Sequence, residues 1–203
     1  RDLDDPKKQL CKSGLCVVSG SHDKTVRIWD VTGREGKDGC LRVLKGHSRC
    51  VNSVAILNDP KKQLCKSGLC VVSGSDDKTV RIWDATGKEG KDGCLRVFEG
   101  HSYRVTSVAI LNDSKKQLCK SGLCVVSGSN DKTVRIWDAV KSTCLYANTF
   151  DSGIESIHVL AVPNSVQTHY FDIKTSSALD HNRQTLHCIA LGLKSGALRV
   201  MYI

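Results

Sequence analysis

The chain has 203 residues, of which 40% are hydrophobic, 25% are charged and only 5% are aromatic, and its formal net charge is +9. This composition is that of one soluble globular domain with an aliphatic core, and it excludes intrinsic disorder. No apolar run approaches the roughly 18 residues that a membrane helix requires, which excludes a helical membrane protein.

A fourteen-residue stretch, Val71–Asp84, has the pattern of a strand, a tight polar turn and a second strand, and it occurs three times. The other copies are Val17–Asp30 and Val125–Asp138. The copies differ only at the residue before the turn aspartate, which is His22, Asp76 or Asn130. A unit repeated at a fixed period of 54 residues predicts a repeat architecture.

Short motifs flank each copy: Gly46-His47 and Gly100-His101 at one end, and Trp29-Asp30, Trp83-Asp84 and Trp137-Asp138 at the other. In these motifs the chain resembles the WD-repeat family of β-propellers, strongly over residues 14–138 and more weakly over 154–203. The resemblance implies an all-β fold in which each blade has four antiparallel strands.

We expect one domain, 1–203, that forms a partial propeller of about three and a half blades, open or closed by a second copy. Blade 1 (14–46) is expected to be incomplete because residues 1–13 contain no counterpart of an inner strand. The sequence begins at Arg1 and its only methionine is Met201, so we expect the natural N-terminus to lie outside it. The expected strands of blade 1 are Leu15–Ser19, Thr25–Asp30 and Cys40–Leu44.

The next two blades are expected to be complete. Blade 2 (47–99) has the predicted strands Val51–Leu57, Leu69–Ser73, Thr79–Asp84 and Cys94–Phe98. Blade 3 (100–149) has Val105–Leu111, Leu123–Ser127, Thr133–Asp138 and Thr143–Tyr146. The period exceeds the 40–45 residues usual for such repeats, and the loops 58–68 and 86–93 are predicted to take up the excess on one face, opposite Asp77.

Beyond Thr149 the pattern degrades. The degenerate blade 4 (150–203) has the predicted strands Ile154–Val162, Leu186–Leu191 and Ala197–Tyr202, with an irregular loop over 163–184. Gly192–Gly196 is expected to replace the usual turn, and Met201 to stand at the tryptophan position.

A recurring polar set has the residue types of a serine hydrolase. A nucleophilic serine needs an exposed elbow and an oxyanion hole, whereas these serines lie within apolar strands, so we expect no catalytic residues and no enzyme. The resemblance implies instead a hydrogen-bonded network that locks each blade. Its expected members are His47, Ser73, Asp77 and Trp83; His101, Ser127, Asp131 and Trp137; and, without a histidine, Ser19, Asp23 and Trp29.

Cysteines recur in pairs, Cys11 with Cys16, Cys65 with Cys70 and Cys119 with Cys124. A structural zinc site usually has four ligands at tight spacing, and each pair supplies two, so we expect no metal and interpret the cysteines as buried small residues or loop thiols. The glycine-rich stretches 33–39 and 87–93 lack the Lys-Ser/Thr and helix of a phosphate-binding loop and predict flexible hairpins, so no cofactor is expected. Eleven cysteines without a disulfide-scaffold composition favour an intracellular, reducing compartment, cytoplasmic or nuclear.

The function that these features indicate is a non-enzymatic scaffold for protein–protein interaction. Positions where the repeats diverge are the partner-binding candidates, with neutral drift as the alternative: His22, Asp76, Asn130, Arg49, Cys50, Tyr103 and Arg104. A rival hypothesis is RNA or anionic-lipid binding by recurring lysines, although no aromatic side chains are interleaved among them: Lys61, Lys62, Lys66, Lys115, Lys116 and Lys120. Self-association through bare blade faces is a further expectation.

Overall fold

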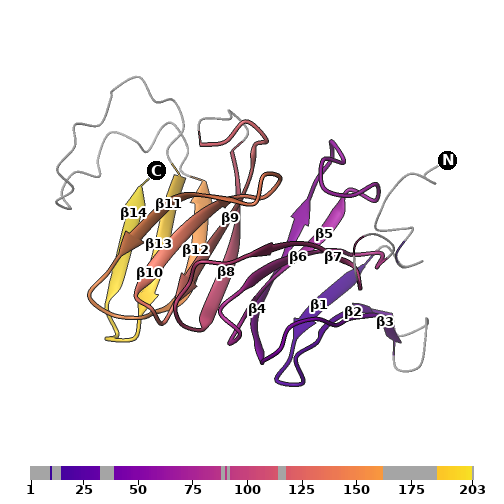
Figure 1. Ribbon diagram of the computed structural model, residues 1–203, viewed down its shortest axis with the longest axis horizontal. Helices are drawn as coiled ribbons and strands as arrows, with labels where there is room; N and C mark the ends of the chain where they lie inside the picture. The colour runs from indigo at the N-terminus through magenta and orange to yellow at the C-terminus, as the bar shows by residue number, and fades with distance from the viewer. Residues whose placement is uncertain are drawn as a thin grey trace.

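The computed structural model describes residues 10, 15–32, 39–87, 90, 92–113, 118–161 and 187–202, with only the backbone of residues 161, 187 and 202. Fourteen strands lie in this part of the chain, arranged as four separate antiparallel sheets that we call blades 1 to 4 (Figure 1). The fold is therefore all-β, as predicted. No helix in these ranges is long and apolar enough to cross a membrane.

Each blade is a meander in which neighbouring strands pair in chain order. Blade 1 contains β1 (Cys16–Gly20), β2 (Val26–Asp30) and β3 (Cys40–Leu44). Blade 2 contains β4 (Val51–Asn58), β5 (Leu69–Ser75), β6 (Val80–Asp84) and β7 (Cys94–Phe98). Blade 3 contains β8 (Val105–Asn112), β9 (Leu123–Ser129), β10 (Thr133–Asp138) and β11 (Thr143–Thr149), and blade 4 contains β12 (Ile154–Ala161), β13 (His187–Leu193) and β14 (Leu198–Tyr202).

Neighbouring blades pack face to face, and a buried apolar cluster lies between each pair. Between blades 2 and 3, for example, Val72 and Ile82 join Val105 and Trp137 in one cluster. Similar clusters lie between blades 1 and 2 and between blades 3 and 4. Because the second strands are apolar on both faces, as in the wholly buried β5 and β9, they can serve two clusters at once.

The inner strands of blades 2, 3 and 4, which are β4, β8 and β12, are linked by hydrogen bonds to serine side chains. The hydroxyl of Ser53 in β4 accepts a hydrogen bond from the backbone N–H of Val108 in β8 at 3.0 Å. Ser107 makes the same contact with the N–H of Ile157 in β12 at 3.1 Å. A Cβ added at Gly74 would lie 2.6 Å from the Val105 side chain, so this glycine permits the close approach of blades 2 and 3.

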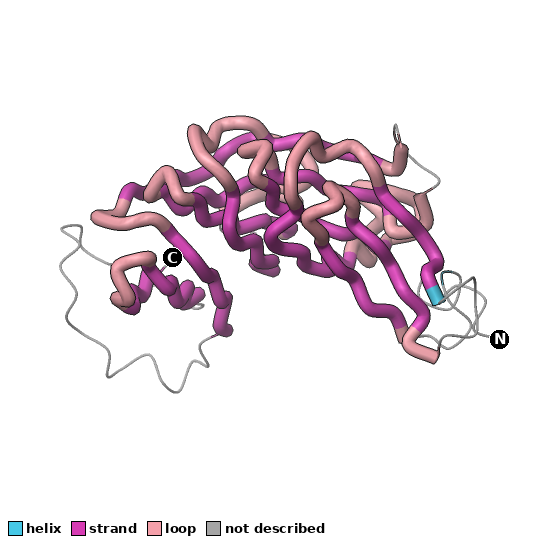
Figure 2. The backbone as a smooth tube through the Cα atoms, turned by 90° about the horizontal axis from the view of Figure 1, so that it is seen from below, coloured by secondary structure: helices cyan, strands magenta, loops and turns pink. Residues whose placement is uncertain are grey.

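The blades form an open stack. Blade 1 and blade 4 lie at opposite ends of the molecule, and the view from below in Figure 2 shows that these ends do not meet. Large apolar side chains are exposed at both ends, including Val17, which is 51% exposed, and Leu198, which is 68% exposed. The structure is thus a partial propeller in which blades 2 and 3 have four strands each, as the sequence predicts.

Two edges of the stack differ in character. The strand-two-to-three turns 21–25, 75–79 and 129–133 lie on the lower edge in Figure 1, which we call the turn face. The 59–68 loop and the described ends of the loop between β8 and β9, residues 113 and 118–122, lie on the opposite edge, which we call the loop face. On this face the Ser67 hydroxyl donates a hydrogen bond to the Asp84 carboxylate at 2.9 Å, which holds the 59–68 loop against the end of β6.

Several predicted boundaries were wrong by one to three residues. β11 continues to Thr149 because its pairing with β10 runs as far as Thr133. The hairpin predicted at Gly192–Gly196 begins two residues later: β13 extends to Leu193, whose N–H donates to the Ala197 carbonyl at 2.9 Å. The predicted strand ends Leu15, Thr25, Thr79 and Ala197 lie outside their strands. The predicted loop 163–184, Val162 and Leu186 lie outside the described residues.

Candidate functional site

The turn face rests on a buried polar network in blade 2. His47 Nδ1 lies 2.7 Å from Asp77 Oδ2, and His47 Nε2 lies 2.7 Å from the Ser73 hydroxyl. The Trp83 indole N–H donates to the same hydroxyl at 2.8 Å. Because an ionised carboxylate can only accept, the proton of the neutral imidazole is assigned to Nδ1, and Ser73 then donates to Nε2. Every polar atom of this chain of groups thus has a partner.

Blade 3 repeats the arrangement. His101 lies 2.9 Å from Asp131 and 2.7 Å from Ser127, and Trp137 donates to Ser127 at 2.8 Å. Both serines are fully buried, so no substrate can reach them, and the resemblance to a hydrolase triad is one of residue type alone.

Blade 1 retains only part of the network. Trp29 donates to Ser19 at 2.8 Å, but Trp29 is half-buried. Asp23 is exposed and accepts bonds from Thr25 at 2.6 Å and from Arg27 at 3.0 Å. The structure therefore brings together the expected residues in blades 2 and 3 and leaves Asp23 apart from Ser19 and Trp29 in blade 1.

The Gly-His pairs fit tightly over the tryptophans. Gly46 has a φ of +151°, and a Cβ built there would lie 2.9 Å from Arg81 Nη1 and 3.2 Å from the Trp83 ring. The Arg81 guanidinium lies 5.8 Å from the centroid of that ring, within the range of a cation–π contact. Only glycine leaves room for this packing directly before the histidine.

Burial and hydrogen bonding oppose each other at the aspartates. Desolvation disfavours the Asp77 carboxylate, but hydrogen bonds from His47 and Thr79 outweigh it and lower the pKa of Asp77 below its ordinary value. Desolvation also opposes ionisation of Asp131, and hydrogen bonds from Thr133 and His101 lower its pKa. Burial lowers the pKa of His101 despite the opposing effect of Asp131. The His101–Asp131 pair is thus held as neutral imidazole and carboxylate near neutral pH, and Asp77 is held as a carboxylate.

Four of the divergent residues are exposed on the turn face: His22, Arg49, Tyr103 and Arg104. Tyr103 is 57% exposed although its backbone carbonyl is fixed by a 3.1 Å bond from the Ser129 hydroxyl. The backbone N–H of Asn130 donates to the Arg104 carbonyl at 3.1 Å, which ties the turn of blade 3 to the start of β8.

The other divergent residues have partners within the protein. Asp76 accepts from the Asn52 amide at 2.7 Å. With the Asn130 amide turned so that its oxygen faces the nearby cations, that oxygen accepts from Arg104 and, at 3.2 Å, from Lys194 in the blade 4 hairpin. The Cys50 thiol contacts the His22 carbonyl at 3.7 Å. Sequence reasoning found these positions but missed that they contact one another.

Four of the recurring lysines lie on the loop face and are exposed: Lys61, Lys62, Lys66 and Lys120. Lys115 and Lys116 lie outside the described residues. The lysine loops and the divergent residues therefore occupy opposite edges of the stack (Figure 1).

Two cysteine pairs come together, one in blade 2 and one in blade 3. Cys65 Sγ lies 3.3 Å from Cys70 Sγ, and the thiol pair Cys119–Cys124 is separated by 3.0 Å. The contact with Cys70 lowers the pKa of Cys65 to about 7. Burial, with the Cys119 contact, raises the pKa of Cys124. Cys11, the partner expected for Cys16, lies outside the described residues.

Sequence reasoning missed the buried aspartate beside each of these pairs. Asp59 is 0% exposed and Asp113 is 2% exposed, and each begins the loop that leads to a cysteine pair. Asp59 accepts a bond from the Leu64 N–H at 2.6 Å, and Asp113 accepts one from the Leu118 N–H at 2.6 Å. The repetition of Asn-Asp six residues before the first cysteine is the signal that could have found them.

Stacked four-stranded blades with a tryptophan, serine and histidine network define an open β-propeller. The family model for the WD domain, G-beta repeat, matches residues 8–30, 38–84 and 92–138, so the chain belongs to the WD40 repeat family. The predicted family is thereby confirmed. A computationally designed protein, Ika4, superposes with a TM-score of 0.58 over 93% of this chain and 85% of its own, at 24% identity, and this likeness supports the fold alone.

Curated relatives resemble part of the chain. A CCR4-associated factor 4 homolog of Candida glabrata is 30% identical over 138 residues, covering 65% of this chain and 20% of its own. A ribosome biogenesis protein WDR12 homolog of Nematostella vectensis is 34% identical over 131 residues, covering 64% and 26%. A nuclear distribution protein PAC1 of Coccidioides posadasii is 34% identical over 140 residues, covering 63% and 26%. The chain matches only about a fifth to a quarter of the length of these relatives.

We expect Ser127→Ala to destabilise the protein by about 2–4 kcal/mol, because it leaves the buried Trp137 N–H and one His101 nitrogen without partners. Ser19→Ala is the matched control, since it removes a single partner of the half-buried Trp29, and we expect it to cost about 1 kcal/mol. Urea unfolding measures both. Equal losses would contradict a stabilising role for the histidine-containing network.

Stability should also depend on pH. The folded-state pKa of His101 is depressed, so its contribution is present above the unfolded value of about 6.5 and is lost as pH falls below it. The lowered pKa values of Asp77 and Asp131 add a second loss as pH falls below about 4. Urea midpoints should therefore decrease from pH 7.5 to 5.5, and His101→Gln should reduce that decrease. An unchanged slope in the variant would contradict the assignment.

Proposed function

We propose that this chain is a non-enzymatic scaffold that binds a partner protein through its turn face, with Tyr103 and Arg104 at the centre of the contact. The observation that carries the proposal is an exposed aromatic side chain on a fixed backbone, 57% exposed and anchored to Ser129. Tyrosine and arginine are enriched among residues that dominate binding energy at protein interfaces.

The rigidity of the scaffold supports the same proposal. The networks of His47 and His101 lie directly beneath the turn face, and their aspartates also accept the N–H groups of Ser48 at 3.1 Å and Ser102 at 2.9 Å. A face whose backbone is fixed in advance loses less entropy on binding. WD-repeat proteins in general serve as interaction scaffolds rather than enzymes, and membership of that family supports this class of function.

An intracellular location is part of the proposal. The ten cysteines in the described ranges are free thiols, which fits a reducing compartment. The relatives named for ribosome biogenesis and for nuclear distribution point to the inside of the cell without distinguishing between cytoplasm and nucleus.

The test is affinity capture with the tagged chain, followed by titration of the captured partner. The double variant Tyr103→Ala/Arg104→Ala should weaken binding at least about tenfold, the effect of losing one strong interface residue, without lowering the melting temperature. Tyr146→Ala is the matched control, because Tyr146 is also an exposed tyrosine, 42% exposed, but lies on the outer strand β11. An equal effect of both variants, or captured material that disappears on nuclease treatment, would contradict the proposal.

A further inference from the structure

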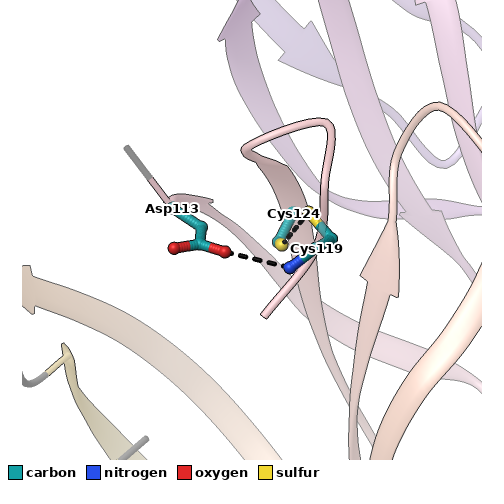
Figure 3. Close-up of side chains that lie close together, drawn as sticks. All are labelled: Asp113, Cys119 and Cys124. Carbon is teal, nitrogen blue, oxygen red and sulfur yellow. Dashed lines mark hydrogen bonds between the residues drawn. The ribbon is translucent and has the colours of Figure 1, made fainter. Parts of the chain in front are cut away.

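Three buried side chains converge on the loop face of blade 3. Asp113 follows β8, Cys119 lies in the loop, and Cys124 lies in β9; their ligand atoms are all within 4.8 Å of one another (Figure 3). The side chains come from residues that are 2%, 6% and 0% exposed, respectively. This convergence of a carboxylate and two thiols is independent of the turn face and of the function proposed for it.

The protein backbone holds the cluster in place. Asp113 Oδ2 accepts hydrogen bonds from the N–H groups of Leu118 at 2.6 Å and Cys119 at 2.9 Å. The N–H of Asp113 in turn donates to the Gly122 carbonyl at 2.9 Å, closing the loop between β8 and β9. Metal-ligating carboxylates are commonly held in place by such outer hydrogen bonds.

The donor set selects the kind of ion. Two sulfurs and one carboxylate oxygen suit a borderline-soft cation such as Zn²⁺, whereas Mg²⁺ and Ca²⁺ prefer oxygen alone. Zinc binds sulfur at about 2.3 Å and oxygen at about 2.0–2.2 Å, so sulfurs sharing a tetrahedral zinc lie roughly 3.8 Å apart. The Cys119 and Cys124 sulfurs, 3.0 Å apart, reach this separation by a movement of under about 1 Å.

We propose that Asp113, Cys119 and Cys124 bind one zinc-class divalent cation. The aspartate is the third ligand that the cysteine spacing alone did not supply. Binding forms two metal–sulfur bonds and one metal–oxygen bond, and the two thiols release two protons to solvent without any change of oxidation state. The fourth tetrahedral position is left to water or another small ligand, and the bound ion cross-links the loop to β9.

Blade 2 offers an internal comparison. It has the same residue types, Asp59, Cys65 and Cys70, but in the described part of the chain only the blade 3 cluster places three such ligand atoms within 4.8 Å. Asp59 accepts the Leu64 N–H, as Asp113 accepts that of Leu118. Variants of blade 2 therefore change thiols of similar burial without touching the proposed site.

The experiment titrates Co²⁺, a spectroscopic substitute for Zn²⁺, into the reduced, metal-free chain. We expect one equivalent to give a thiolate-to-cobalt charge-transfer band and the visible bands of a tetrahedral site, both removed by added Zn²⁺. Cys119→Ser should abolish the bands, Asp113→Asn should weaken binding at least about tenfold, and Cys65→Ser should leave them unchanged.

A second measurement needs no variant, in case Cys119→Ser does not fold. X-ray absorption at the zinc edge of the wild-type chain should show two sulfurs at about 2.3 Å together with oxygen at about 2.0–2.2 Å. An absence of the charge-transfer band, a band that survives Cys119→Ser or falls equally in Cys65→Ser, or a zinc shell of four sulfurs or of none would overturn the site.

Discussion

The constraint on which the structure depends is the indole N–H of a tryptophan buried between two sheets. Trp83 and Trp137 supply large apolar surfaces to the clusters that hold neighbouring blades together. Their N–H groups are out of reach of water and must find an acceptor inside the protein. The serine in the adjacent strand provides it, the histidine satisfies the serine, and the aspartate orients the histidine. A continuous chain of hydrogen bonds thus connects the buried indole to the aspartate at the turn face.

This arrangement couples stability to the geometry of a surface. The aspartate at the end of each network also shapes its turn, since Asp77 accepts the N–H of Thr79 at 3.0 Å as well as that of Ser48 at 3.1 Å. Residues that flank these turns are therefore presented on a backbone set by the core. The loop face is built differently: its loops are closed by the buried aspartates Asp59 and Asp113, and each loop contains one cysteine of a pair whose other member lies in β5 or β9. The two edges of the protein thus differ in their polar groups: histidine–aspartate networks underlie the turn face, and buried aspartates with thiols underlie the loop face.

Much of the fold was predictable because it is repeated. Three copies of one strand-turn-strand unit, with Gly-His and Trp-Asp at fixed distances, gave the family, the sheet order and the strands to within a few residues. The network residues followed from the resemblance, and the buried positions of Ser73 and Ser127 agree with their place in apolar strands. The β13–β14 hairpin was misplaced because Gly192, which suggests a turn, instead lies in the strand opposite Ser156.

Contacts between distant residues could not be derived from the pattern. Asn130 was singled out because it differs among the copies, but its bond to Lys194 joins two blades through a hairpin whose sequence differs from that of the repeated turns. The convergence of Asp113 with Cys119 and Cys124 likewise depends on how a loop folds back on its strands: the repeated Asn-Asp singles out the aspartate, but spacing along the chain does not show that the three side chains meet. Periodicity fixes which residues face the core, whereas the path of the loops decides which polar groups meet.

Hydrogen exchange of the three indole N–H groups, followed by NMR, tests the central claim most directly. If the histidine-containing networks secure the blades, the indole protons of Trp83 and Trp137 exchange only through large-scale unfolding. The indole of Trp29, which has Ser19 alone, should exchange at least roughly tenfold faster. Equal exchange rates for all three, or exchange of Trp83 at the rate of an exposed loop, would contradict the account.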